Sequence, residues 1–130
     1  MQAILSSPSL LRNALLVDAI GTGATGLLMA VAASLLAPLL GLPENLLFYA
    51  GLLLILFSGF VYITANGQPI SRKAAMAIII LNALWVIDSI ALLASGWVEP
   101  TRLGYVFVVG QALVGGVFAE LQFIGLRRQA

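Results

Sequence analysis

The chain has 130 residues, of which 62% are hydrophobic and 8% are charged, and its net charge is +1. Its mean hydropathy is +1.10, so too few polar side chains are present to cover a soluble globule of this size, and the bilayer must be the solvent for most of them. The near balance of six basic and five acidic residues, with no basic run longer than two, argues against a nucleic-acid partner. Cysteine and histidine are absent, which excludes disulfides, thiolate chemistry, haem–histidine ligation and the usual zinc sites.

Four apolar runs, each about as long as a helix that crosses a bilayer, follow one another along the chain. No run alternates polar and apolar residues, and an open sheet edge cannot face lipid, so strands are not expected. We therefore predict a single all-α membrane domain over residues 1–130, an antiparallel bundle of four transmembrane helices. The spans are expected at about residues 10–36, 46–65, 72–94 and 102–126.

Turn residues separate these spans. Pro38 is expected to bend or end the first span. Residues 41–45 form the first turn, in which Asn45 is placed to cap the second span. Residues 66–69 form the second turn, and Ser71 can cap the third span.

The first span contains several small and polar residues. Arg12, an apolar stretch and Ala30-Val31-Ala32 are also typical of a signal peptide, but Asp18 and residues 21–23 interrupt the apolar core, so we expect a retained transmembrane helix. Residues 21–26 match G-x-G-x-x-G, yet no strand precedes them, so a dinucleotide loop is not expected.

The same stretch is expected to remain an intact, slightly bent helix, whose threonine hydroxyls bond back to the preceding turn. The alternative is a weak or unwound segment that lines a site, as in transporters with broken helices. Small side chains that recur every four residues favour packing within the chain's own bundle over a dimerisation face. They are Thr22, Gly26, Ala30 and Ser34.

The basic residues are distributed unevenly between the two ends of the spans. Arg102 is the only one expected on one side, where Glu99 lies nearby. By the positive-inside rule, the opposite side is cytoplasmic, and both termini lie there. That side carries Arg12, Arg72, Lys73, Arg127 and Arg128.

Four segments of the chain are similar in sequence to a known family: Leu39–Pro43, Asn82–Val86, Gln111–Leu113 and Ala119–Arg128. They resemble segments of a family of small four-span bacterial inner-membrane proteins, and the resemblance covers most of the chain from the first span onward. It implies a four-span fold and a multi-pass location in the bacterial inner membrane. The family has no assigned activity, so the resemblance identifies no catalytic residues.

Three carboxylates lie within the expected spans, where a charged side chain costs about 2.5–3.5 kcal/mol on insertion scales. Asp18 and Glu120 are at a similar depth toward the cytoplasmic side. We expect one of these two acids to pair with Arg12 or Arg127. Asp88 lies toward the outer half and is more isolated.

These carboxylates, together with the amides of the spans, have three interpretations: interhelical clamps, steps in an ion or proton path, or a binding site for a polar ligand or lipid headgroup. Gln111 and Glu120 fall on opposite faces of their helix, and Asn82 and Asp88 also fall on different faces. A continuous polar seam is therefore missing, which favours the clamps.

The last span also has a candidate contact surface. Gln111, Gly115 and Gln122 share one helix face, opposite Glu120. If Glu120 faces the bundle, that face points away from it, and we expect it to contact another subunit. The alternative is that Gln122 reaches the headgroup region while Gln111 bonds within its own bundle.

These features favour a small membrane protein that acts by association, as an accessory subunit of a larger membrane protein or as a homo-oligomer. The alternative is a small oligomeric transporter of ions, protons or a solute that uses the membrane carboxylates, and it would show a water-filled cavity reaching Asp18, Glu120 or Asp88. A lipid-modifying enzyme is a second alternative, although no nucleophile–base pair is visible. We therefore expect no catalysis, no cofactor and no tightly bound metal.

Overall fold

The computed structural model describes residues 10–128, and within this range the chain forms five helices and no strand. Four of the helices are long and apolar enough to cross a membrane. The expected all-helical membrane class is therefore confirmed at the level of four candidate spans. The helices are α2 (Leu10–Val31), α3 (Ala33–Leu40), α4 (Glu44–Ala65), α5 (Arg72–Ala94) and α6 (Arg102–Arg128).

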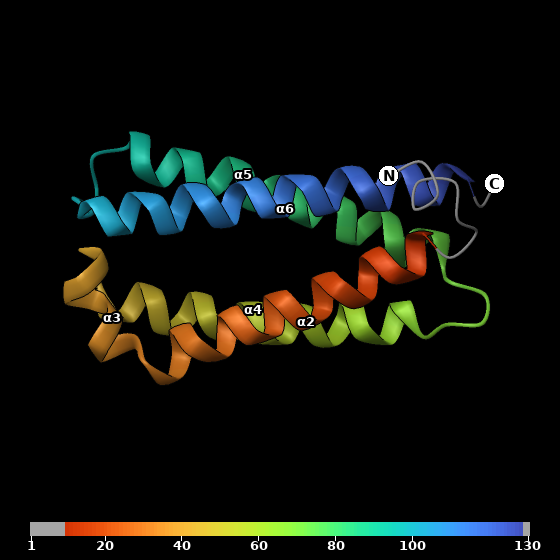
Figure 1. The fold of residues 1–130 in the computed structure, drawn as a ribbon, viewed down its shortest axis with the longest axis horizontal. Helices are drawn as coiled ribbons and strands as arrows, with labels where there is room; N and C mark the ends of the chain where they lie inside the picture. Colours follow the sequence, from red (N-terminus) through yellow and green to blue (C-terminus); the bar gives the residue numbers. More distant parts are fainter. Residues whose placement is uncertain (1–9, 129–130) are drawn as a thin grey trace.

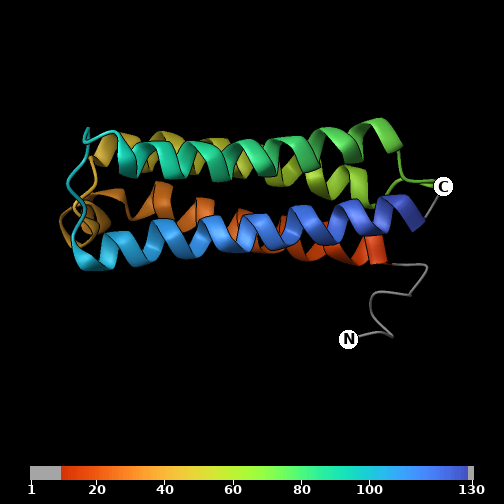
Figure 2. The same ribbon diagram turned by 90° about the horizontal axis from the view of Figure 1, so that it is seen from above.

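The long helices are arranged as two pairs. Helix α2 packs mainly against α4, and α5 packs mainly against α6 (Figures 1 and 2). The α2/α4 pair and the α5/α6 pair are joined mainly by contacts of α6 with α2 and α3, whereas α4 and α5 touch little. The bundle is therefore closer to two helix pairs placed side by side than to a uniformly packed four-helix core.

Two glycines allow α2 and α4 to approach closely. A Cβ atom added at Gly26 would lie 2.7 Å from the carbonyl oxygen of Gly51, and a Cβ added at Gly51 would lie 2.6 Å from the carbonyl oxygen of Gly26. Without side chains, the two backbones can touch, which is how small residues join helices in membranes. The prediction that the small residues of the first span pack within their own bundle is confirmed at Gly26.

The end of the first span differs from the prediction. Helix α2 ends at Val31, and Ala32 has φ −105° and ψ 22°, which changes the direction of the chain (Figure 1). Pro38 lies inside α3, so it neither ends nor interrupts that helix. A proline removes one backbone donor without preventing helical φ, whereas the positive φ of 68° at Gly41 ends α3.

The helix starts agree only partly with the predicted caps. Ser71 caps α5 as expected, because its hydroxyl accepts a hydrogen bond of 3.2 Å from the backbone N–H of Ala74. Asn45 is not a cap, since α4 begins at Glu44 and Pro43 occupies the capping position without a side-chain bond. Instead, the acidic side chain of Glu44, in the first turn, interacts favourably with the positive end of the helix dipole.

Helix α6 contacts the other pair at both of its ends. At one end, the backbone N–H of Thr101 donates to the carbonyl of Leu40 over 3.0 Å, and a Cβ at Gly104 would overlap that carbonyl oxygen. At the other end, a Cβ at Gly125 would lie 2.8 Å from the Cα of Leu11. Both ends of α6 are thus in backbone contact with the α2–α3 segment.

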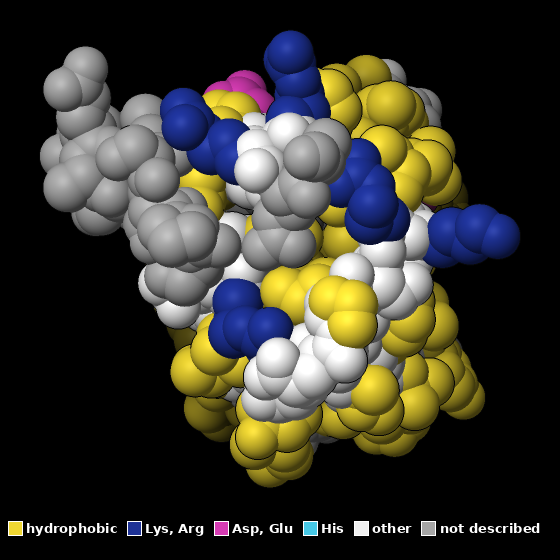
Figure 3. Space-filling view, turned by 90° about the vertical axis from the view of Figure 1, so that its right-hand side faces the viewer, with side chains coloured by type: hydrophobic (Ala, Val, Ile, Leu, Met, Phe, Trp, Pro, Cys, Tyr) yellow, Lys and Arg dark blue, Asp and Glu magenta, His cyan; other side chains and the backbone are white. Residues whose placement is uncertain are grey.

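The outer surface is apolar along the long helices. Large side chains such as Ile20, Leu56, Ile87 and Val106 are exposed on four different helices. This pattern is unfavourable in water and favourable in lipid. Lysine and arginine side chains lie around the end at which α2 begins and α6 ends (Figure 3). The chain is therefore described as a multi-pass membrane protein.

Candidate functional site

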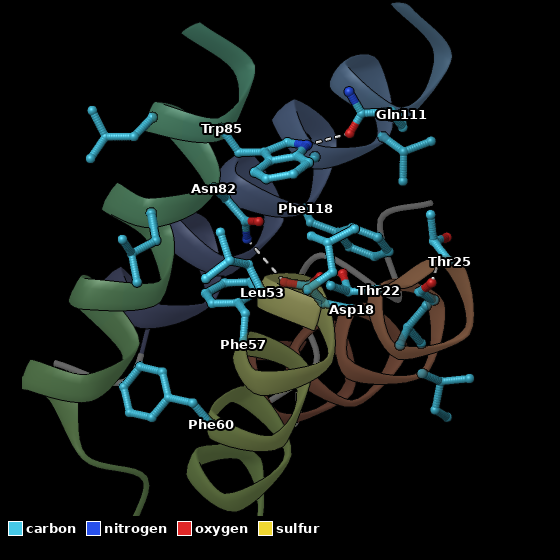
Figure 4. Close-up of a pocket in the computed structure, with 18 of the residues that line it drawn as sticks. Asp18, Thr22, Thr25, Leu53, Phe57, Phe60, Asn82, Trp85, Gln111 and Phe118 are labelled. Atoms are coloured by element: carbon cyan, nitrogen blue, oxygen red, sulfur yellow. Dashed lines mark hydrogen bonds between the residues drawn. The ribbon is translucent and has the colours of Figure 1, made fainter. Parts of the chain in front are cut away.

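A cavity of about 840 Å³ lies between the two helix pairs, and all four long helices line it. Most of its wall is apolar, and the aromatic lining residues are Phe57, Phe60, Trp85 and Phe118. Figure 4 shows Asp18, Asn82, Trp85 and Gln111 at this cavity, from helices that belong to both pairs. The cavity thus combines an apolar wall with a small number of polar groups.

Asp18 on α2 is the centre of a buried polar cluster. Its Oδ2 atom accepts hydrogen bonds from Asn82 Nδ2 on α5, over 2.9 Å, and from Gln122 Nε2 on α6, over 2.7 Å. The Oδ1 atom accepts a bond of 2.7 Å from the hydroxyl of Thr22, one turn further along α2. Asn82 also donates to Gln122 Oε1 over 3.1 Å. One carboxylate therefore joins three helices.

The cluster is buried and its hydrogen-bonding groups are satisfied. Asp18 is 1% exposed and Gln122 is fully buried. Within residues 10–128, no buried polar side-chain atom is without a hydrogen-bond partner. Interhelical hydrogen bonds of this kind contribute about 0.6 kcal/mol each in membrane proteins, with larger values near 1–2 kcal/mol. The Asp18 cluster therefore acts as an interhelical clamp between the two pairs.

A second polar group fixes the position of Trp85. The indole Nε1–H donates to Gln111 Oε1 (Figure 4). Gln111 Nε2 donates to the hydroxyl of Ser89 over 2.9 Å and to the carbonyl of Val108 over 2.9 Å. Ser89 in turn donates to the carbonyl of Trp85 over 2.7 Å. These bonds join α5 to α6 and hold the tryptophan ring at the wall of the cavity.

Asp88 is the second carboxylate of the cavity. It follows Asn82 on the same helix, and a rise of about 1.5 Å per residue places it about 9 Å from the level of the Asp18 cluster. Its side chain is exposed and lines the cavity. No other described residue forms a hydrogen bond or ion pair with its carboxylate. Asp18 and Asp88 are therefore at different depths and have different surroundings.

The expected pairing of Asp18 or Glu120 with an arginine is not what the structure contains. Arg12 donates to the carbonyl of Ala65 and, over 3.0 Å, to that of Gly67. No described lysine or arginine lies within salt-bridge distance of either acid. The backbone carbonyls at the end of a helix have no helical partner, and Arg12 satisfies them.

Arg127 is the other arginine that was expected to pair with these acids. Its guanidinium lies 5.8 Å from the centre of the Phe123 ring, within range for a cation–π contact. Arg72 is also occupied at this end, since it donates to the carbonyl of Leu126 over 2.9 Å. Arg12, Arg72 and Arg127 therefore form their contacts at the ends of the helices. Asp18 lies deeper in the bundle and accepts hydrogen bonds from neutral groups.

The two faces of α6 are reversed relative to the prediction. Gln122 lies inside the bundle and completes the Asp18 cluster, whereas Glu120 is exposed on the opposite side. Gln111 and Gly115 line the cavity, so the face expected to contact another subunit is turned toward its own chain. The physical reason is that the amide of Gln122 has two partners there, whereas a buried Glu120 would have lacked a cation.

Sequence reasoning also missed the aromatic residues of the site. The signal was present, because Gln111, Gly115, Phe118 and Gln122 share one face of a helix. A face that carries two amides, a glycine and an aromatic ring is as well suited to line a cavity as to contact a subunit. By contrast, nothing in the sequence connects Phe57 on α4 to that face.

No protein-family model, no curated protein and no solved structure matches the chain. The site is therefore interpreted from its own geometry. It offers an apolar space of ligand size, an oriented tryptophan and two carboxylates, of which Asp18 is bonded and Asp88 faces the cavity. Such a site can bind and orient a molecule that is mostly apolar and carries a polar group.

Proposed function

We propose that this protein binds a small, largely apolar molecule within the membrane, in the cavity between the α2/α4 pair and the α5/α6 pair. The chain would sit in a bacterial inner membrane as four antiparallel spans with cytoplasmic termini. The observation that carries the proposal is the cavity of about 840 Å³, lined by all four long helices.

The size and lining of the cavity support binding. Ligand sites in proteins are typically clefts of roughly 300–1,000 Å³ with mostly apolar walls and few polar groups. Protein interiors otherwise pack at the density of organic crystals and leave few voids. A half-open space of this volume between two helix pairs is therefore suited to hold a molecule.

The cavity favours ligand binding over the association that the sequence predicts. The face of α6 expected to contact a partner is formed by Gln111, Gly115 and Gln122, and it is directed toward the cavity and the chain's own bundle. The transport alternative predicted a water-filled cavity that reaches a membrane carboxylate. This cavity reaches Asp18 and Asp88, but its wall is mostly apolar. Homo-oligomerisation and association with a larger membrane protein stay predictions.

The ligand is expected to enter from the lipid between α4 and α5. These two helices touch little, and the lining residues Leu53, Leu56 and Leu84, which belong to them, are exposed. An apolar molecule dissolved in the bilayer would reach the cavity by this lateral route without crossing the polar ends of the bundle. The route suits a ligand that partitions into membranes.

Filling the cavity tests the proposal. Gly110 lines the cavity, and a Cβ at this position would meet nothing within 4 Å, so Gly110→Phe is expected to occupy the space without a clash. Gly59 on α4 is equally free of neighbours but does not line the cavity, so Gly59→Phe is the matched control.

The measurement is the binding of Nile red, a neutral apolar dye, to protein in lipid nanodiscs, with protein-free nanodiscs as the blank. We expect saturable binding, which Gly110→Phe weakens at least tenfold and Gly59→Phe leaves unchanged. No binding above that of the blank, or an equal loss in both variants, would refute the proposal.

The orientation can be tested with single cysteines, because the natural chain has none. Gln68 and Trp97 are exposed at opposite ends of the bundle. With cytoplasmic termini, a membrane-impermeant maleimide should label Trp97→Cys in intact cells and should label Gln68→Cys only after the cells are opened. Labelling of Gln68→Cys in intact cells would reverse the topology.

A further inference from the structure

The ionisable side chains at the cavity are all acidic. Asp18 and Asp88 line it, and no lysine or arginine is among the described residues that do so. The basic residues instead lie at the ends of the spans. There the guanidinium groups of Arg12 and Arg72 contact backbone carbonyls, and that of Arg127 contacts an aromatic ring. An ionised carboxylate in this environment is costly unless a positive charge comes close to it. The cavity is therefore complementary to a cation.

Asp88 is the carboxylate available to a ligand. The oxygens of Asp18 already accept three hydrogen bonds, from Thr22, Asn82 and Gln122. The carboxylate of Asp88 has no hydrogen bond or ion pair with another described residue, and it faces the cavity. The two acids thus differ in their surroundings: Asp18 joins helices through hydrogen bonds, and Asp88 presents its carboxyl group to the space between them.

The aromatic wall points to the same class of ligand. Trp85 lies about one helical turn from Asp88, on the same helix, and its ring is held by the bond to Gln111. Phe57 and Phe118 line the cavity from α4 and α6 (Figure 4). The faces of aromatic rings attract cations, most strongly those of tryptophan, and the attraction increases where water is excluded.

The geometry favours an organic cation over a metal ion. The divalent ions Mg²⁺ and Ca²⁺ need several oxygen ligands at distances of about 2.0–2.6 Å. Asp18 and Asp88 differ by about 9 Å in depth along the bundle, and no group of three or more acidic side chains among residues 10–128 can converge on an ion. A single positive charge within an apolar body matches one exposed carboxylate in an apolar cavity.

We infer that the ligand of the cavity is a lipophilic monovalent cation, such as an alkylated amine or a quaternary onium ion. Its charge lies near Asp88, and its apolar body lies against Trp85 and the phenylalanine side chains. This inference rests on the proposed function, since it names the chemical class of the molecule that the cavity binds. Lipid acyl chains and a second copy of the protein are the competing occupants.

The experiment compares two organic ions of similar size and opposite charge. Protein in nanodiscs of zwitterionic lipid is titrated with tetraphenylphosphonium and, separately, with tetraphenylborate, and protein-free nanodiscs are the blank. Nile red serves as the neutral probe. We expect tetraphenylphosphonium to bind saturably and to displace Nile red, and tetraphenylborate to do neither.

The variant Asp88→Asn keeps the size of the side chain and removes its charge. We expect it to weaken tetraphenylphosphonium binding at least tenfold relative to the Nile red affinity of the same variant. A misfolded variant would lose both probes, so this ratio separates loss of charge from loss of structure. Glu120→Gln is the control, because Glu120 is exposed outside this cavity, and its ratio should equal that of the natural chain.

The outcomes separate the two proposals. Equal binding of the cation and the anion, or an unchanged ratio in Asp88→Asn, would overturn the cation inference while Nile red binding still supports the cavity. Absence of binding by every probe would overturn the proposed function itself. A co-purifying phospholipid that tetraphenylphosphonium does not displace, or a dimer that closes the cavity, would also overturn the inference.

Discussion

The two ends of α6 and its middle are built from the same residue types but pack in opposite ways. At the ends, Gly104 and Gly125 allow backbone contact with Leu40 and Leu11 of the other pair. In the middle, a Cβ at Gly110 would meet nothing within 4 Å, and one at Gly115 would meet only a methyl group of Val86 at 3.8 Å. The end glycines bring helices together, whereas the middle glycines leave space.

This difference accounts for the position of the cavity in a small bundle. Backbone contacts at Gly104 and Gly125 and the hydrogen bond of Gln122 to Asp18 join the two pairs near the ends of α6, whereas the middle of the helix borders the cavity. A small side chain at a contact improves packing, and a small side chain at a cavity enlarges it. The role of a glycine in a membrane helix is therefore set by what faces it.

The largest effect is expected from Gly104→Ala. The added Cβ would overlap the carbonyl oxygen of Leu40, and the helices would have to separate, at a cost of about 3 kcal/mol, the upper end of the usual range for overpacking. The free energy of unfolding in mixed micelles with sodium dodecyl sulfate, followed by circular dichroism, measures the loss.

Gly110→Ala is the matched control for this prediction, because it lies on the same helix with free space around it. Alanine is a better helix former than glycine by about 1 kcal/mol, so this variant should be as stable as the natural chain or slightly more stable. Equal destabilisation of both variants would show that the ends and the middle of α6 do not differ.

A smaller effect is expected from Gln122→Leu. The substitution removes one donor to Asp18 and one acceptor of Asn82, and it should lower the free energy of unfolding by about 1–2 kcal/mol, as for other hydrogen bonds in this environment. The same denaturation assay measures it. Glu120→Leu, on the opposite and exposed face, is expected to leave stability unchanged or to raise it. If Glu120→Leu is the more harmful of the two, the assigned orientation of α6 is wrong.

The smallest effect is expected from Arg12→Gln. Arg12 bonds to the carbonyls of Ala65 and Gly67 at the end of α4, and a shorter amide cannot reach both, so the loss should be about 0.5–1 kcal/mol. Arg128 is exposed and forms no bond to another described residue, so Arg128→Gln should cost less. Amide hydrogen exchange should show local loosening near residues 62–67 only in Arg12→Gln, and equal exchange in both variants would contradict the capping role.

Sequence patterns identified the relation between the faces of α6 but not their direction. Opposite faces for Gln122 and Glu120 follow from helical periodicity alone. Which face points inward depends on the hydrogen-bond partners inside the bundle. For Gln122 these partners are Asp18 and Asn82. Because both faces of a membrane helix are largely apolar, the hydrophobic pattern that orients a helix in a soluble protein is missing.

The end of the first span also could not be predicted from local sequence. Pro38 is the local signal for a helix end, yet the chain turns at Ala32, where the sequence contains only alanine and valine neighbours. The turn places Leu39 and Leu40 where their carbonyls accept hydrogen bonds from Thr101. That contact joins residues 62 positions apart, so no window of local sequence could have predicted it.

The sequence by itself determined that this chain consists of helices apolar enough to cross a membrane, separated by turns at glycine, proline and serine residues. Hydropathy, turn chemistry and capping act over a few neighbouring residues, so they can be read directly along the chain. Only the tertiary structure decided that Asp18 bonds to Asn82 and Gln122, which are 64 and 104 positions away, and that a cavity separates the helix pairs. These features depend on which helices touch. Glycine contacts and single polar groups that are far apart in the chain determine how closely the helices approach.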